Sequence, residues 1–60
     1  MYIFEAHYIN MDKDEEITRT IEFSEQFFEN EQECYVHAMQ RAYSMKQENE
    51  LLCSVEFIAC

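Results

Sequence analysis

The chain has 60 residues, of which 48% are hydrophobic and 15% aromatic, so it suits one small domain and is too apolar for a disordered tail. Thirteen acidic residues against four basic ones give a formal net charge of −9, which disfavours direct binding to nucleic acid or to an anionic membrane surface. The sequence has no glycine and no proline, which excludes a glycine-rich phosphate loop.

Residues 2–9 predict the first strand, because they are rich in aromatic and β-branched side chains. One face of this strand is apolar and is expected to meet the core: Tyr2, Phe4, Ala6 and Tyr8. The other face mixes apolar with polar side chains: Ile3, Glu5, His7 and Ile9. Apolar side chains on both faces favour a central position in a sheet.

Residues 10–15 predict a polar turn in which Asn and Asp take the left-handed conformations that glycine would otherwise supply. Residues 16–23 then alternate as a second strand, so the two strands form a hairpin. The core face of the second strand comprises Ile17, Arg19, Ile21 and Phe23. We expect Arg19 to lay its stem over the core from an edge strand and to reach solvent with its guanidinium group.

Residues 31–48 predict a helix. Its expected core face gathers the apolar side chains of Cys34, Tyr35, Ala38, Met39, Ala42 and Met45. On the outer face, His37 is expected to form a ladder with Glu33 and Arg41 at four-residue spacing.

The ends of this helix are predicted from capping patterns. Asn30 with Glu33 forms a capping-box pattern, and Asn49 is the expected left-handed C-terminal cap. A start at Ser24 is the alternative, but such a helix would bury Glu31 and exceed the length of the strands. With the start at Asn30, Phe27 and Phe28 are expected to close one end of the core.

Residues 51–59 predict the last strand. We expect two alternating faces: Leu51, Cys53, Val55, Phe57 and Ala59 towards the helix, and Leu52, Ser54, Glu56 and Ile58 away from it. A right-handed connection through the helix returns this strand beside the first one. The sequence therefore predicts one domain over residues 1–60, of the α+β class. It is a two-layer β-β-α-β fold whose three-stranded antiparallel sheet, in order 2-1-3, has the helix on one face.

The sheet face opposite the helix is the first candidate functional surface. It is expected to carry apolar side chains with one histidine among them: Ile3, His7, Ile9, Leu52 and Ile58. Exposed apolar groups favour an interface, and a chain this short gains stability from a second copy. We therefore expect a protein-interaction module that forms a homodimer through this face or through an edge strand.

The acidic side chains form the second candidate surface. They crowd into two segments, with Asp12, Asp14, Glu15 and Glu16 in one and Glu25, Glu29, Glu31 and Glu33 in the other. Spaced carboxylates can imitate nucleic-acid phosphates, so the alternative function is an acidic inhibitor of a DNA- or RNA-binding protein with a basic surface, encoded by a phage or mobile element. In size and acidity the chain is similar to known anti-restriction and anti-CRISPR proteins, although no motif matches.

Catalytic and metal-binding patterns are weak in this sequence, so we expect no enzyme and no cofactor. The serines have no adjacent base, and a structural zinc site needs four ligands where Cys34 and His37 offer two. Three cysteines without a disulfide framework favour a reducing cytoplasm, and we expect no secretory signal or transmembrane span. Cys34 and Cys53 are expected to be buried, and Cys60 to be either a reactive thiol or merely exposed.

Overall fold

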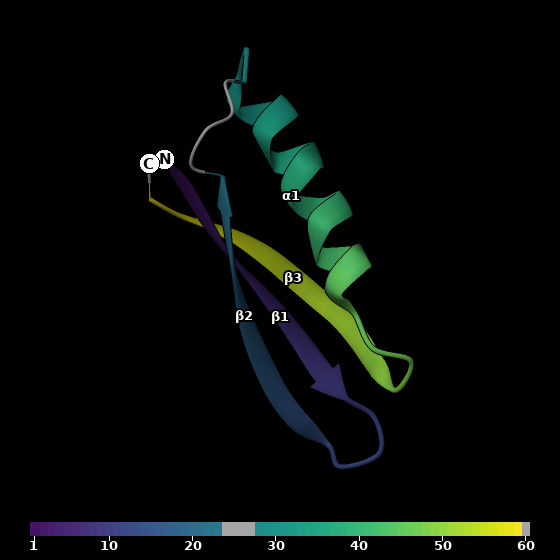
Figure 1. Cartoon of the computed structure of the whole chain (residues 1–60). Coiled ribbons are helices and arrows are strands. Elements are labelled where there is room, and N and C mark those ends of the chain that lie inside the picture. Colours follow the sequence, from purple (N-terminus) through teal and green to yellow (C-terminus); the bar gives the residue numbers. More distant parts are fainter. Residues whose placement is uncertain (24–27, 60) are drawn as a thin grey trace.

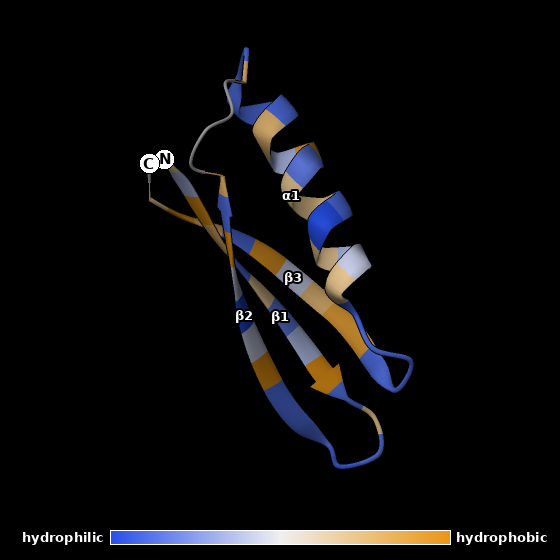
Figure 2. Ribbon diagram, in the orientation of Figure 1, coloured by the Kyte–Doolittle hydropathy of each residue, from blue (hydrophilic) through white to orange (hydrophobic). Residues whose placement is uncertain are grey.

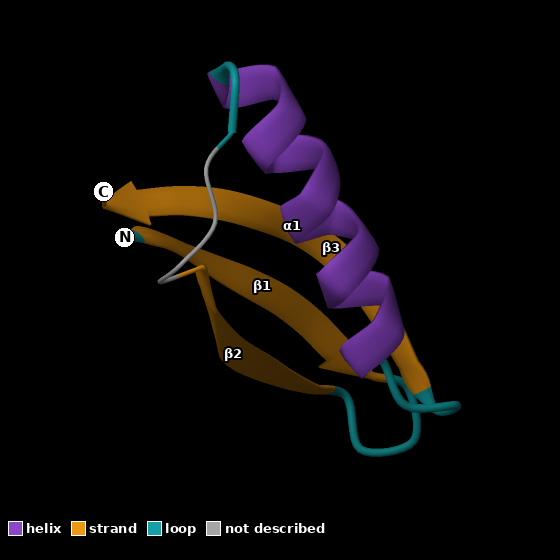
Figure 3. Cartoon of the chain, turned by 45° about the horizontal axis from the view of Figure 1, so that its top comes forward, coloured by secondary structure: helices purple, strands orange, loops and turns teal. Residues whose placement is uncertain are grey.

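The structure, a computed structural model, describes residues 1–23 and 28–59. Its elements in chain order are β1 (Tyr2–Asn10), β2 (Glu15–Phe23), α1 (Glu31–Met45) and β3 (Glu50–Ala59). The strands form one sheet in the order β2-β1-β3, with β1 antiparallel to both neighbours. The helix lies across one face of this sheet (Figures 1 and 3). The predicted α+β fold and strand order are thus confirmed.

The turn between β1 and β2 is held by the side chain that begins it. Asn10 Oδ1 accepts hydrogen bonds from the backbone N–H groups of Asp12 and Lys13, both at 3.0 Å. Asp14 has a φ of 54°, so an aspartate takes the left-handed conformation in a chain that lacks glycine. The predicted use of Asn and Asp in this turn is confirmed.

The N-terminus of α1 lies where the capping pattern predicted it. Asn30 has an extended backbone, and its Oδ1 accepts a hydrogen bond from the N–H of Glu33 at 2.8 Å. The Glu33 carboxylate accepts from the N–H of Glu29 at 2.9 Å, one residue before the partner that a capping box would use. The alternative helix start at Ser24 is wrong, because residues 28–30 are not helical.

The C-terminal end of the helix was predicted incorrectly. The helix ends at Met45 rather than at residue 48, and Lys46 follows as an extended cap. Asn49 belongs to the next turn, where its carbonyl oxygen accepts a hydrogen bond from the N–H of Met11 at 2.8 Å. The chain leaves the helix early because a buried side chain, Glu50, binds the backbone of this segment.

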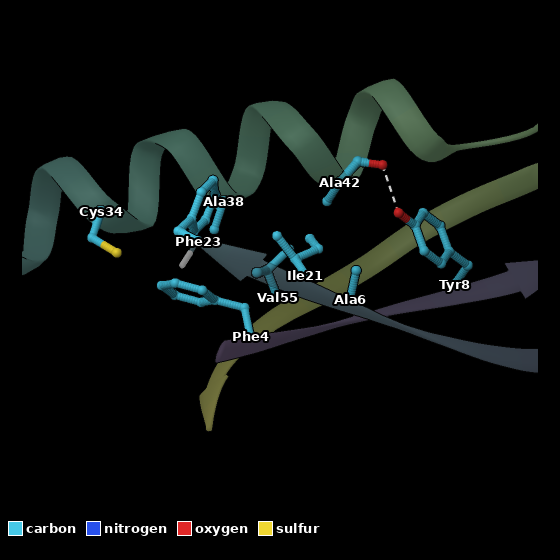
Figure 4. Packing of buried hydrophobic residues seen from close by; sticks show 9 residues of the cluster. All are labelled: Phe4, Ala6, Tyr8, Ile21, Phe23, Cys34, Ala38, Ala42 and Val55. Atoms are coloured by element: carbon cyan, nitrogen blue, oxygen red, sulfur yellow. Dashed lines mark hydrogen bonds between the residues drawn. The ribbon is translucent and has the colours of Figure 1, made fainter. Parts of the chain in front are cut away.

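The core lies between α1 and the sheet, as Figure 4 shows. Its fully buried members come from all four elements: Phe4, Ala6, Tyr8, Ile21, Phe23, Cys34, Ala38, Ala42 and Val55. Ala38 and Ala42 have no exposed surface, and their small side chains let the helix approach the sheet. The hydroxyl of Tyr8 donates a 2.6 Å hydrogen bond to the carbonyl oxygen of Ala42, which fixes this close approach.

Aromatic side chains close the end of the core near the start of α1. The ring of Phe28 packs edge-on against the rings of Tyr2 and Phe23, each at 5.4 Å. The predicted role of Phe28 is therefore confirmed, while Phe27 lies outside the described residues. The predicted ladder on the outer helix face gives way to ring contacts, because His37 lies 5.2 Å from the ring of Phe28 and Arg41 lies 5.2 Å over Phe23.

A buried ion pair holds the opposite end of the core. The guanidinium group of Arg19 donates two hydrogen bonds to the carboxylate of Glu50, at 2.6 and 2.7 Å, and Glu50 is only 3% exposed. The prediction that Arg19 reaches solvent holds only in part: 25% of its side chain is exposed, but the guanidinium group binds the Glu50 carboxylate on the core side of the sheet. The guanidinium group also lies 4.7 Å over the ring of Tyr8.

The carboxylate of Glu50 also connects the ion pair to the chain that leaves the helix. Its Oε1 accepts a 2.9 Å hydrogen bond from the N–H of Gln47. The hydrogen bonds from Arg19 and from Gln47 both favour the ionised form, and they lower the pKa of Glu50 to about 2. One carboxylate thereby ties together β2, the end of α1 and the start of β3.

Replacement of Glu50 by Gln should lower the free energy of unfolding at pH 7. The pKa of Glu50 falls on folding from 4.5 to about 2, so its stabilising effect is complete above pH 4.5 and is lost as the pH drops towards 2. The difference between wild type and Glu50→Gln in urea unfolding should therefore shrink over that pH interval. Glu48→Gln, at an exposed position in the same turn, is the control. A difference that stays constant down to pH 2 would contradict the role given to Glu50.

Candidate functional site

The sheet face opposite the helix is polar at its centre and apolar towards its ends. Ile3, His7 and Ile9 lie on this face of β1, as predicted, because Phe4, Ala6 and Tyr8 point into the core. The strands on either side contribute polar partners at the centre, since Thr18 and Ser54 lie opposite His7. The apolar residues of this face are therefore not a continuous patch.

Two irregularities in β3 change which of its side chains reach the open face. The pairing of β1 with β3 shifts between His7 and Tyr8, where Cys53 is the extra residue, and between Ile3 and Phe4, where Ile58 is the extra residue. Each shift reverses the alternation that a regular strand would keep. The strictly alternating pattern predicted from the sequence therefore misplaces the residues before Ser54. It also misplaces Ala59, which was expected towards the helix but lies opposite Ile3 on the open face.

The predicted placement of Leu52 on the open face is wrong for this reason. Leu52 lies opposite Tyr8 and packs against the core, whereas Leu51 lies opposite Ile9 and is exposed. Cys53 is exposed at the bulge and not buried as predicted. Ile58 is 49% exposed at the second shift, so it is accessible near the end of the sheet.

The centre of the open face brings together three side chains that can bind a proton or a cation. Glu5 and Glu56 are direct cross-strand partners, and His7 lies two residues along β1 on the same face. The ligand-type atoms of these three side chains lie within 4.8 Å of one another. The Nε2 atom of His7 is 3.5 Å from Oε2 of Glu56. His7 is one of the site residues predicted from the sequence, whereas Glu5 and Glu56 are not.

The acidic residues of the second candidate surface form two groups at opposite ends of the molecule (Figure 1). Asp12, Asp14, Glu15 and Glu16 lie at the turn between β1 and β2, whereas Glu29, Glu31 and Glu33 lie at the start of α1. Glu25 lies outside the described residues. Some of these carboxylates have local partners, such as Asp12, which accepts a hydrogen bond from the side chain of Asn49 at 3.2 Å. The structure therefore does not join the two groups into one surface.

A cleft between the first turns of α1 and the sheet was not predicted. The N-terminal half of the helix diverges from β3 (Figures 1 and 3). The cleft has a volume of about 440 Å³ and is lined mainly by aromatic side chains, with two polar ones: Tyr2, Phe4, Glu31, Gln32, Cys34, Tyr35 and Phe57. The Tyr35 hydroxyl crosses to β3, where it donates a 3.1 Å hydrogen bond to the carbonyl oxygen of Val55.

Phe57, on the edge strand β3, is one of the residues that line this cleft. It packs at 5.4 Å against the ring of Phe4 on one side, and 53% of the residue remains exposed. The cleft is formed by the angle between the helix and the sheet, and that angle cannot be predicted from the pattern of residues in the sequence. The unusual number of aromatic residues was the signal available in the sequence.

None of the described residues form a helix that is both long and apolar enough to cross a membrane. Comparison of the chain with models of protein families, with curated proteins and with solved structures finds no match in any of the three.

The two leucines at the start of β3 test the altered register. Leu52→Ala should lower the free energy of unfolding by about 1–2 kcal/mol, because its half-buried side chain packs against the core. Leu51→Ala, the matched control, should change it by less than about 0.5 kcal/mol, because Leu51 is exposed. Urea unfolding of both variants makes the comparison. A larger loss of stability in Leu51→Ala than in Leu52→Ala would indicate a regularly alternating strand and would contradict the bulge at Cys53.

Proposed function

We propose that the chain is a small non-enzymatic interaction module that forms a homodimer along the outer edge of β3. The two edges of the sheet differ in charge, and this difference carries the proposal. On β2 the exposed side chains include three glutamates, Glu15, Glu16 and Glu22. Residues 51–59 of β3 include only one charged side chain, Glu56. For a chain of net charge −9, a second copy meets the least repulsion along β3.

The backbone of β3 offers the hydrogen-bonding groups for such a pairing. β3 has β1 as its neighbour in the sheet, and its other side is an edge. The stretch from Ser54 to Phe57 runs without a register shift between the extra residues Cys53 and Ile58. We expect the antiparallel pairing of two copies to centre on this regular stretch, since bulges limit pairing on either side of it.

Side chains beside this edge supply apolar surface for the contact. Leu51, Phe57 and Ile58 are 53%, 53% and 49% exposed. Figure 2 shows that β3 is coloured mostly towards the hydrophobic end of the scale, whereas the turn between β1 and β2 is mostly hydrophilic. Phe57 also borders the aromatic cleft, so a second copy along β3 would cover the exposed part of this ring. Burial of such rings is a main source of affinity at protein interfaces.

The shape of the molecule supports assembly as well. The chain measures 38 × 17 × 16 Å, and its radius of gyration of 12.0 Å exceeds the value of about 10 Å that is typical for 60 residues. An elongated small domain buries little of its surface, so contact with a second copy adds stability that the single core lacks. We also propose a cytoplasmic location, because a reducing compartment would keep the exposed thiol of Cys53 reduced.

Replacement of Ile58 by Asp should weaken the dimer at least tenfold, which corresponds to about 1.4 kcal/mol. The added charge lies at the proposed contact, where it adds to the repulsion between two acidic copies. Val36→Asp is the matched control, because Val36 is 46% exposed, close to the 49% of Ile58, but lies on α1. Sedimentation equilibrium over a range of concentrations should show weakened self-association for Ile58→Asp only.

Salt concentration separates this function from the acidic inhibitor. Salt screens the repulsion between two acidic chains, so the proposed dimer should hold or tighten from low to high ionic strength. Binding of an acidic inhibitor to a basic protein should instead collapse over the same range, and neutralising Asp12, Asp14, Glu15 and Glu16 should abolish it. A wild-type chain that stays monomeric at all concentrations, or equal effects of the two Asp substitutions, would overturn the dimer.

A further inference from the structure

The three side chains at the centre of the open sheet face bring two carboxylates opposite each other, beside one histidine. The register places Glu5 directly opposite Glu56, on the same face of neighbouring strands. Like charges in directly opposite positions destabilise a sheet. The neighbouring residues of the open face on β2, Glu16, Thr18, Thr20 and Glu22, add two more carboxylates and no positive charge. A positive charge between Glu5 and Glu56 would remove the repulsion.

The ring of His7 is oriented so that one nitrogen faces this pair. Its Nδ1 atom lies 3.3 Å from the hydroxyl oxygen of Thr18, within hydrogen-bonding distance. Its Nε2 atom is buried and has no hydrogen-bond partner, although Oε2 of Glu56 lies 3.5 Å away. When Nδ1 carries the proton and donates a hydrogen bond to Thr18, the lone pair of Nε2 is left free at 3.5 Å from Oε2 of Glu56. Metal-binding histidines have this arrangement, with one nitrogen on the ion and the other on a hydrogen-bond partner.

We propose that Glu5, His7 and Glu56 bind one divalent ion of the zinc type. One imidazole nitrogen with two carboxylate oxygens suits Zn²⁺ and its transition-metal neighbours better than Mg²⁺ or Ca²⁺, which prefer oxygen ligands alone. Ligand atoms at about 2.1 Å from a tetrahedral Zn²⁺ lie about 3.4 Å apart. The present separations of up to 4.8 Å close to that value through small rotations of the glutamate side chains.

Two of the three side chains reach solvent, although the Nε2 atom of His7 is itself buried. Glu56 has 61% of its side chain exposed, and His7 has 34%. A hollow of about 210 Å³ at the bulge of β3 is lined by His7 and Glu56 but not by Glu5. Three protein ligands leave at least one coordination position, which water fills. The net charge of −9 attracts cations to this surface.

Calorimetric titration of the full chain with ZnCl₂ tests the site. The wild type should bind one Zn²⁺ per chain, and His7→Asn and Glu56→Gln should each weaken binding at least tenfold. The same titration with MgCl₂ should show no comparable binding. The ¹⁵N resonance of His7 Nε2 should shift on addition of Zn²⁺, which reports coordination independently of affinity. Circular dichroism should confirm that each variant is folded.

Three matched variants separate this site from other ways of binding zinc. Glu22→Gln removes the same charge from the same face of the sheet but outside the cluster. His37→Asn removes the other histidine, which is exposed on α1, and Cys53→Ser removes the exposed thiol. All three should bind Zn²⁺ within about twofold of the wild type, a difference of about 0.4 kcal/mol.

Each alternative result overturns the proposal. Absence of one-to-one binding, or loss of binding in Cys53→Ser or His37→Asn, would assign zinc affinity to other groups. An equal loss in Glu22→Gln and Glu56→Gln would indicate diffuse attraction to an acidic surface. Retention of wild-type affinity in His7→Asn would show that the imidazole is not a ligand. The dimer proposed along β3 is measured separately, in the absence of metal, so either proposal can fail alone.

Discussion

The buried ion pair between Arg19 and Glu50 is the interaction on which the arrangement of the other elements depends. It joins the edge strand β2 to the start of β3 across the central strand. Its carboxylate also accepts a hydrogen bond from the backbone N–H of Gln47, where the chain leaves α1. The ionised carboxylate of Glu50, which is 3% exposed, is stable only when its partners are in place, because an unpaired buried carboxylate has a large desolvation penalty. The pair therefore disfavours any packing of α1 that separates β2 from β3. The apolar core alone, with alanines at the helix contact, would discriminate less between alternative packings of α1 on the sheet.

The sequence predicted the parts of the fold that depend on local patterns. Alternation over β1 and β2 identified their core faces, and the cap at Asn30 identified the start of α1, since each signal lies within a few residues. The end of the helix was missed because Glu50 acts from the next strand on the backbone of Gln47. The partner of Arg19 was missed for the same reason, because Glu50 lies 31 residues away in the sequence.

The candidate site depends on register, which a single strand does not reveal. The extra residues in β3 leave no mark in the composition, because Cys53 and Ile58 fit a regular strand as well as a bulge. The exchange of Leu51 and Leu52 between faces follows from one of these residues. Glu56 meets Glu5 only through the pairing of β1 with β3, so the cluster around His7 could not be derived from sequence spacing. The cleft beside Phe57 depends in turn on the helix angle.

The unequal edges of the sheet have a consequence for how large an assembly can grow. Strands that add to both edges of a sheet propagate without limit, which is the geometry of fibrils. Here β2 ends the sheet with three exposed carboxylates, while β3 has one exposed carboxylate, that of Glu56. A pair of copies related by a twofold axis through β3 would bury both of the less charged edges and leave the two more acidic edges outside. Growth would then stop at two copies, because the acidity of β2 would oppose the addition of a third.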